Sequence, residues 1–274
     1  MNLTSARAAK KWLMTGGVAQ YNSLLMSTKP VTPAPPTPAK STEKNVTTLA
    51  IDIGGSGLKM MLLDSAGKPL SERQRVDTPA KPTPEAVLKC LDQLSKHVGA
   101  FDRVSAGFPG VIKRGATWTA ANLDSGWLGF PLQAELEKLW KKPARVANDA
   151  AVQGYGVIIG DGVELALTLG TGLGSSLFTS GRLCPGLELA HHPWRKGRTY
   201  EDFLGRRGLD KLGRKRWNKL VQEAIDQTAR LFNWDHLYIG GGNTKKLDFE
   251  MPKNVKVVSN EAGLLGGVAL WREW

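Results

Sequence analysis

Cysteine is scarce in this chain, because the 274 residues include only Cys90 and Cys184. The spacing of these two residues fits neither a disulfide framework nor a structural metal site. A zinc site built from Cys184, Glu188, His191 and His192 would match no structural or catalytic zinc pattern. We therefore expect no zinc and a chain that is kept in the reduced state.

Long apolar runs are also missing, since no stretch approaches the roughly 18 residues that a membrane-spanning helix needs. The sequence therefore predicts no membrane partner. Together with the scarcity of cysteine, this indicates a soluble protein of the cytoplasm.

Acidic residues are absent from the start of the chain until Glu43. The same region is rich in proline, threonine and alanine from Lys29 to Thr42, a composition that cannot bury a core. We expect residues 1–44 to form a disordered Pro/Thr-rich leader, although its basic character leaves an organelle-targeting role open. About 230 residues then remain, which favours two lobes with cores of their own.

Negative charge is in deficit overall, and the net charge at neutral pH is +12. Ten basic and three acidic residues stand between Arg195 and Lys219, so this basic segment holds a net charge of +7. Such a concentration indicates a polyanionic partner, whether a nucleic acid, a membrane surface or a phosphate polymer. Charge alone leaves a second interpretation equally open, in which the segment is an ordinary solvated helix face.

Two glycine-rich turns stand in opposite halves of the chain. They are DIGGSG at 52–57 and TLGTGLG at 168–174. Apolar runs flank each turn, which predicts a strand-turn-strand hairpin in both places. Glycine lets backbone N–H groups converge on an anion without a Cβ in the way, so such turns can hold phosphates. One turn alone is weak evidence, but its repetition predicts a phosphate cradle.

Helical and strand patterns alternate around the two turns and predict a mixed α/β fold. The first half adds a strand near 69–76, a helix over 84–97, a strand over 103–108, a helix over 131–140 and a strand over 144–147. The second half adds an irregular stretch over 183–199, helices near 200–212 and 217–232, a strand over 236–239 and a closing helix capped by Asn260. We expect an N-terminal lobe over 45–148, to which the closing helix over 261–274 returns, and a larger C-terminal lobe over 149–260.

Phosphoryl transfer requires a protein to hold phosphates with N–H groups and a cation and to orient an attacking oxygen. Asp52 can bind Mg²⁺ directly or through water. The alternative is that Asp52 only braces its turn through the backbone. The other candidate phosphate ligands lie in or beside the two turns: Gly54, Gly55, Ser56, Gly57, Lys59, Thr171, Gly172 and Gly174.

Asp149 is the candidate general base. It follows a short strand, and a carboxylate at a strand end beside a cleft can accept a proton from a sugar hydroxyl. The alternative role is that of N-cap for a helix that begins at Ala150. Compact polar side chains suited to the hydroxyls of a sugar ring are Asn122, Asn148, Glu188 and His191.

Seven short motifs follow one another along the chain. They are AIDIGGSGLK (50–59), FPGV (108–111), ANLDSGW (121–127), ANDA (147–150), TLGTGLG (168–174), ELAH (188–191) and GGG (240–242). In order and spacing, over about residues 46–271, they resemble the ROK family of actin-type sugar kinases, most closely its polyphosphate glucokinase branch. The resemblance implies a two-lobed, actin-like (ribonuclease H-like) ATPase fold with a duplicated mixed β-sheet domain, whose lobes close over a sugar.

The resemblance also implies roles for the matching residues. Asp149 would be the base, and Gly241 and Gly242 would lie near a nucleotide or the distal phosphates of the donor. The sugar ligands would be Asn122, Asn148, Asp149, Glu188, His191 and Glu201.

Some features depart from the family pattern. Many ROK proteins have a cysteine-rich zinc loop shortly after a Glu-x-Gly-His motif, whereas no cysteine follows Cys184 here, and the glycine of that motif is replaced by Ala190. ROK repressors carry an N-terminal helix-turn-helix. The Pro/Thr-rich leader cannot form one, so we expect no nucleic-acid partner.

These observations predict a Mg²⁺-dependent glucokinase that moves a terminal phosphate from inorganic polyphosphate to the 6-hydroxyl of glucose. A chain with about one charge per phosphate needs a long cationic surface, which the basic segment offers. The polyphosphate track would include Arg206, Arg207, Arg214 and Lys215. The alternative donor is ATP, alone or alongside polyphosphate, with mannose as a further acceptor. A homodimer, a non-catalytic sugar sensor and a filament-forming actin relative are further alternatives.

Overall fold

The computed structural model describes residues 46–120, 123–259 and 262–272 of the chain. Three expectations lie outside these residues: the disordered leader over 1–44, the sugar ligand Asn122 and the helix cap Asn260. Within the described residues, no helix has both the length and the apolar character needed to cross a membrane.

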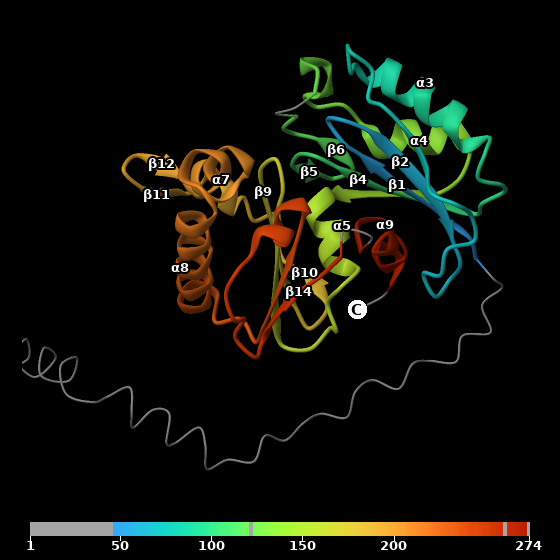
Figure 1. Ribbon diagram of the computed structural model, residues 1–274. Helices are drawn as coiled ribbons and strands as arrows, with labels where there is room; N and C mark the ends of the chain where they lie inside the picture. The colour runs from blue at the N-terminus through green and yellow to red at the C-terminus, as the bar shows by residue number, and fades with distance from the viewer. Residues whose placement is uncertain (1–45, 121–122, 260–261, 273–274) are drawn as a thin grey trace, which may run out of the picture. The chain divides into compact units, whose positions relative to one another are not determined.

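Two five-stranded mixed sheets with the same topology form the framework (Figure 1). The first contains β1 (Thr48–Ile53), β2 (Leu58–Leu63), β3 (Gln74–Val76), β4 (Arg103–Phe108) and β7 (Ala144–Asn148). The second contains β8 (Val163–Leu169), β9 (Leu173–Thr179), β10 (Arg182–Leu183), β13 (His236–Gly240) and β14 (Val255–Val257). Their strand orders are β3-β2-β1-β4-β7 and β10-β9-β8-β13-β14. The expected duplication of a mixed β-sheet is therefore confirmed.

Both predicted hairpins are present and antiparallel. In the first, Asp52 pairs with Lys59 and Ile53 pairs with Leu58, so the chain reverses over residues 54–57. In the second, Thr168 pairs with Gly174, and the reversal covers residues 170–172. On its other edge each hairpin continues into parallel strands, β4 beside β1 and β13 beside β8. Each glycine turn therefore lies at the carboxyl edge of its parallel strands, where ligands of α/β proteins commonly bind.

Helices cover both faces of the sheets. Those assigned as α-helices are α3 (Pro84–Ser95), α4 (Leu132–Trp140), α5 (Asp149–Tyr155), α6 (Tyr200–Leu204), α7 (Arg206–Leu212), α8 (Arg214–Phe232) and α9 (Ala262–Leu265). Tighter 3-10 segments are η1 (Ser125–Trp127), η2 (Leu189–His191), η3 (Gly242–Lys246) and η4 (Val268–Trp271). Two small hairpins join β5 (Ile112–Lys113) to β6 (Ala116–Thr117) and β11 (Pro193–Arg195) to β12 (Arg198–Thr199).

The residues of β1 point alternately to the two faces of the first sheet. Leu49, Ile51 and Ile53 are buried in the core that includes residues of α3 and α4. Ala50 points the other way and packs with Leu264 and Val268 from the end of the chain. Successive strand residues point to opposite faces of a sheet, so Asp52 shares the face of Ala50.

Helix α5 lies between the two sheets and contacts strands of both (Figure 1). On the first sheet, Gly107 of β4 lies against the Cα of Asp149. On the second sheet, Ser176 Oγ donates to the carbonyl of Ala150 at 3.0 Å. A Cβ at Gly154 would lie 2.6 Å from Ser176 Oγ, so glycine is needed for this approach. The lobe boundary between 148 and 149 stays a prediction.

Several elements differ from their predicted extents. The helix expected near 217–232 begins at Arg214, and the stretch over 183–199 that was expected to be irregular contains η2 and the β11–β12 hairpin. The helix expected near 200–212 is two helices, because Gly205 between them has extended backbone angles (φ −70°, ψ 176°). The strand expected near 69–76 is confined to β3, and Pro69 makes only an isolated bridge with Leu63. The closing helix is short, since α9 ends at Leu265 and η4 follows.

Candidate active site

A cavity of about 600 Å³ opens between the two glycine turns and the N-terminus of α5. Both sheets contribute to it, because its lining includes both turns and the loops that follow β4 and β10. The predicted site residues that line it are Gly54, Gly55, Ser56, Asn148, Asp149, Thr171, Gly172, Gly174, Glu188, His191 and Glu201. Those absent from its lining are Asp52, Gly57, Lys59, Gly241, Gly242, Arg206, Arg207, Arg214 and Lys215.

Close backbone contacts hold the first glycine turn. The amide of Gly54 donates to the carbonyl of Gly57 at 3.1 Å, and a Cβ at Gly54 would lie 2.8 Å from that same oxygen. From outside the turn, Thr78 Oγ1 donates to the carbonyl of Gly54 at 2.6 Å. Gly55 and Ser56 are exposed at the tip and line the cavity, so the turn can present backbone to an anion.

Glu201 on α6 holds the second glycine turn. Its Oε2 accepts a hydrogen bond from the amide of Leu173 at 3.0 Å. The same carboxylate lies where a Cβ at Gly172 would stand, so a larger residue at 172 would displace Glu201 from this bond. Within the turn, the amide of Gly174 donates to Thr168 Oγ1 at 3.1 Å. One oxygen of the predicted sugar ligand Glu201 is therefore already engaged with the backbone.

A third turn, over 240–242, adjoins the second one. Asn243 is buried, and its Nδ2 donates to the carbonyl of Gly170 at 2.7 Å. Gly241 has a positive φ of +97° and packs against the backbone of Leu169, which leaves no room for a side chain. Gly241 and Gly242 do not line the cavity.

Asp52 forms an ion pair beneath the first turn. Its Oδ2 lies 2.7 Å from Lys59 Nζ, and the two residues are directly opposite each other on β1 and β2. Their side chains are 27% and 34% exposed, so solvent still reaches both. The pair joins two residues predicted as a metal ligand and a phosphate ligand.

Asp149 is the first residue of α5 and opens onto the cavity. The N-cap of the helix is Asn148, whose Oδ1 accepts from the amide of Ala150 at 2.9 Å. The alternative that Asp149 serves as the N-cap is therefore wrong, although its Oδ1 accepts from the same amide at 2.8 Å.

The surroundings of Asp149 make its carboxyl group less acidic than usual. Desolvation by the enclosing protein is the main cause, and the negative charge of Asp52 is the next; together they raise the pKa of Asp149 to about 6. A carboxylate with such a pKa is ionised at neutral pH and is still basic enough to accept a proton. This combination is common for a general base.

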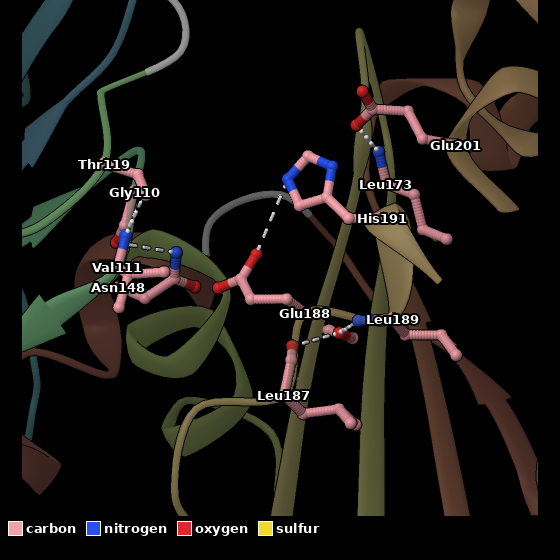
Figure 2. Close-up of polar contacts among 11 residues, drawn as sticks. Gly110, Val111, Thr119, Asn148, Leu173, Leu187, Glu188, Leu189, His191 and Glu201 are labelled. Carbon is pink, nitrogen blue, oxygen red and sulfur yellow. Dashed lines mark hydrogen bonds and ion pairs between the residues drawn. The ribbon is translucent and has the colours of Figure 1, made fainter. Parts of the chain in front are cut away.

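Three further polar side chains, those of Asn148, Glu188 and His191, line the cavity together with Asp149. Figure 2 shows the side chain of Glu188 between those of Asn148 and His191. Glu188 Oε2 and His191 Nε2 are 3.8 Å apart across one turn of η2. Partial burial, followed by the charge of Glu201, raises the pKa of Glu188, while the charge of His191 opposes the shift. Asn148 Nδ2 donates to the carbonyl of Gly110 at 3.1 Å. These groups offer hydrogen-bond donors and acceptors in one place, as recognition of several hydroxyls requires.

The basic segment contacts the second turn at Arg206. The amide of Arg206 bonds to the carbonyls of Gly170 and Thr171 at 3.0 and 3.1 Å. Beyond α7, a second hollow of about 570 Å³ is lined by residues 212–216 and Lys219. Arg206 pairs with Asp210, and Arg214 pairs with Asp248, so part of the charge is already compensated.

Some residues of the cavity lining were not predicted as ligands. Pro109, Gly110 and Thr119 come from the first sheet, and Thr168 and Ser175 come from the second. The FPGV motif did mark the first two, whereas no local pattern distinguishes Thr119 or Ser175. No group of three or more His, Cys, Asp or Glu side chains arranged to hold a metal occurs in the described part of the chain.

Comparison with known proteins matches this chain to sugar kinases. The sequence profile of the ROK family matches residues 48–193. A polyphosphate glucokinase of Mycobacterium tuberculosis is 30% identical over 248 residues, which cover 84% of this chain and 92% of that protein. A polyphosphate glucokinase of Mycobacterium leprae is 28% identical over 253 residues, covering 85% of this chain and 77% of the relative.

Solved structures agree with the sequence comparison. The inorganic polyphosphate/ATP-glucomannokinase of Arthrobacter sp. strain KM has a TM-score of 0.73 and 31% identity, covering 83% of this chain and 100% of that one. A ROK glucokinase of Streptomyces griseus, solved with glucose and AMPPNP, has a TM-score of 0.64 and 21% identity, covering 82% and 98%. The predicted actin-like (ribonuclease H-like) ATPase fold is therefore confirmed.

Proposed function

The chain belongs to the ROK family, and from this premise we propose that it is a glucokinase that uses inorganic polyphosphate as its phosphate donor. The observation that carries the proposal is the position of Asp149, whose carboxylate opens onto a cavity shared with both glycine turns. A sugar hydroxyl and a terminal phosphate that occupy this cavity together would meet beside a base. Neither a sugar sensor nor a filament subunit needs such a base.

The proposed reaction is a direct phosphoryl transfer. Asp149 accepts the proton of the 6-hydroxyl of glucose as O6 bonds to the terminal phosphorus of the donor. The bond between that phosphorus and the bridging oxygen breaks, and the shortened polyphosphate leaves with the electron pair. Backbone groups of the two glycine turns hold the donor in line with O6, which removes much of the entropic barrier.

A magnesium ion fits this donor set. Mg²⁺ in phosphoryl-transfer sites is usually held by one or two carboxylates together with phosphates and water rather than by a cage of protein ligands. Asp52 supplies such a carboxylate, directly or through water, and its charge already acts on the Asp149 carboxyl, which is left to serve as the base. When bound, the ion would neutralise charge on the transferred phosphate.

The sugar side of the site would be formed by Asn148, Glu188 and His191, with Asn122 and Glu201 as further ligands. Glu201 would use the carboxylate oxygen that does not hold the amide of Leu173. The relative from Arthrobacter is a glucomannokinase, so mannose is the second acceptor to test.

Polyphosphate is preferred over ATP as the proposed donor because of the basic segment. A phosphate chain entering at Thr171 would meet the N-terminus of α7 and then the basic hollow lined by Arg214, Lys215, Arg216 and Lys219. Helix α7 has seven residues and so spans about 10 Å, which a few phosphates can bridge. ATP, alone or as a second donor, is the alternative, because the name of the Arthrobacter glucomannokinase includes ATP as a donor.

The experiment that tests this function measures glucose 6-phosphate formed with Mg²⁺ and glucose, with long-chain polyphosphate, ATP or neither in parallel. Turnover with polyphosphate well above that with ATP is the expected result. Turnover with ATP alone would make the chain an ordinary glucokinase. If neither donor gave glucose 6-phosphate, the alternative of a non-catalytic sugar sensor would be favoured.

The pH dependence of turnover is expected to follow Asp149. The carboxylate must be ionised to accept a proton, and its pKa is about 6. Below that pH, kcat/KM for glucose should fall about tenfold per pH unit, and above about pH 7 it should level off. The Asp52 charge contributes to the raised pKa, so Asp52→Asn should move the acid limb to lower pH, whatever it does to kcat.

Asp92→Asn on α3 provides the control for this pH profile. Asp92 is ion-paired with exposed Lys96, and the change should leave the acid limb in place. An acid limb that stays unshifted in Asp52→Asn would refute the coupling between Asp52 and Asp149.

Neutralising two residues of the basic segment should raise the KM for polyphosphate and leave the KM for ATP nearly unchanged. Arg207 and Lys215 are exposed, whereas Arg206 and Arg214 have carboxylate partners and are better left intact. The double change Arg207→Gln and Lys215→Gln should raise the KM for long polyphosphate about tenfold and flatten its salt dependence. The KM for ATP should change by less than about twofold.

A matched pair of neutralised lysines on helices α3 and α4, Lys89→Gln and Lys138→Gln, controls for net charge. Equal effects of the Arg207 and Lys215 changes on both donors would show that the segment is a solvated helix face.

A further inference from the structure

We propose that Arg75, on β3, binds a phosphate group of the donor together with Lys59 beside the first glycine turn. This inference rests on the proposed function and adds a ligand that the sequence motifs do not contain. Its basis is the row of charged residues that face one another on neighbouring strands of the first sheet.

One row of residues runs across the five strands of that sheet. Arg75 is directly opposite Lys59, Lys59 is opposite Asp52, Asp52 is opposite Gly107, and Gly107 is opposite Ala147. Side chains of directly paired residues lie on the same face of a sheet. Arg75 therefore shares a face with Asp52 and Lys59.

This face is the one that meets α5 and the cavity. Gly107, in the same row, lies against the Cα of Asp149. The opposite face is closed by α3 and α4, where Leu58 and Met60 are buried. The guanidinium of Arg75 consequently lies on the catalytic side of the sheet and not on its outer side.

The guanidinium also covers the end of the first glycine turn. A Cβ at Gly57 would lie 3.1 Å from Arg75 Nε and 3.2 Å from Nη2. Gly57 is buried beneath this side chain, although Gly55 and Ser56 at the tip of the turn are exposed. A phosphate held by the tip would be close to the donor groups of Arg75, which suit its oxygens in a bidentate manner.

The row contains two cations, Arg75 and Lys59, and one carboxylate, Asp52. Two cations directly opposite each other on neighbouring strands repel. Asp52 pairs with Lys59 at 2.7 Å, and Arg75 pairs with Asp77 at 2.7 Å. Asp77 is 81% exposed and Arg75 is 52% exposed, so their ion pair is weak and easily exchanged for a phosphate. Asp77 therefore competes with the donor for Arg75.

The experiment compares four variants by calorimetric titration with tripolyphosphate and Mg²⁺ in the absence of glucose, so that no turnover occurs. Arg75→Gln should weaken tripolyphosphate binding about tenfold, as loss of one charge-assisted contact does. Arg75→Lys should weaken it less, because the charge is kept. Asp77→Asn should strengthen binding, since it removes the competing carboxylate. Lys89→Gln, an exposed charge on the opposite side of the sheet, should change it by less than about twofold.

A parallel titration with glucose 6-phosphate tests whether Arg75 binds a phosphate of the donor or the phosphate of the product. If Arg75→Gln weakens the binding of glucose 6-phosphate and spares tripolyphosphate, the site is for the product and the proposal is wrong. The proposal is also wrong if Arg75→Gln and Lys89→Gln bind tripolyphosphate with the same affinity. If the wild-type protein transfers no phosphate from any donor while tripolyphosphate binding still depends on Arg75, the proposed function fails and the phosphate site stands.

Discussion

Asp149→Asn is expected to lower kcat by about 10²–10⁴-fold while glucose still binds, because an amide cannot take the proton of the 6-hydroxyl. The fold should tolerate this change. Asparagine keeps the Oδ1 that accepts from the amide of Ala150, and Asn148 remains the N-cap of α5. Steady-state kinetics with polyphosphate give kcat, and calorimetry with glucose alone gives the binding constant.

The residual activity of Asp149→Asn provides a second measurement. Without the carboxyl group that has a pKa of about 6, the acid limb of the pH profile should disappear. Asp226→Asn, an exposed change on α8, is the matched control and should keep both kcat and the acid limb. A kcat for Asp149→Asn within about tenfold of the wild-type value would show that another group acts as the base.

Local signals in the sequence were sufficient for most of the elements around this base. The two hairpins were predictable because glycine turns and apolar runs are short-range features, and both are present. Thr83 and Pro84 mark the start of α3 in the same way, since Thr83 Oγ1 accepts from the amide of Ala86. The split between α6 and α7 was missed because an isolated glycine is also tolerated inside helices.

Long-range pairing explains what the sequence did not reveal about the site. Glu201 holds the amide of Leu173 across 28 residues, and no local pattern announces such a bond. The position of Arg75 depends on the register between β2 and β3, which is decided by tertiary packing. Asn148 rather than Asp149 became the cap because the strand ends at Asn148. Boundaries of this kind vary by a residue or two and are hard to infer from sequence.

Trp217→Ala is expected to lower the free energy of unfolding by about 3–5 kcal/mol. Trp217 is fully buried on α8, in the core that also contains Leu169 and Leu173 from either side of the second turn. Its Nε1 donates to the carbonyl of Leu204 at 3.0 Å, so truncation both empties a large volume and leaves a buried carbonyl without its partner. Urea denaturation at constant pH measures the change through the midpoint and the slope.

The loss of packing in Trp217→Ala should also alter the active site, because α6 connects the two. Leu204 ends the helix that carries Glu201, and Glu201 holds the second glycine turn through Leu173. A loosened α6 is therefore expected to raise the KM for glucose and for the donor in the folded fraction. Trp217→Phe removes the N–H but keeps most of the ring volume, so it should lie between the wild type and Trp217→Ala, and it remains measurable if the alanine variant does not fold.

Trp118→Ala is the control for loss of a tryptophan as such. Trp118 is 57% exposed, and its removal should cost less than about 1 kcal/mol even though Lys113 lies over its ring. If Trp217→Ala cost no more than Trp118→Ala, the α8 core would not be what holds the second turn in place. The KM effects would then have to arise from the turn itself.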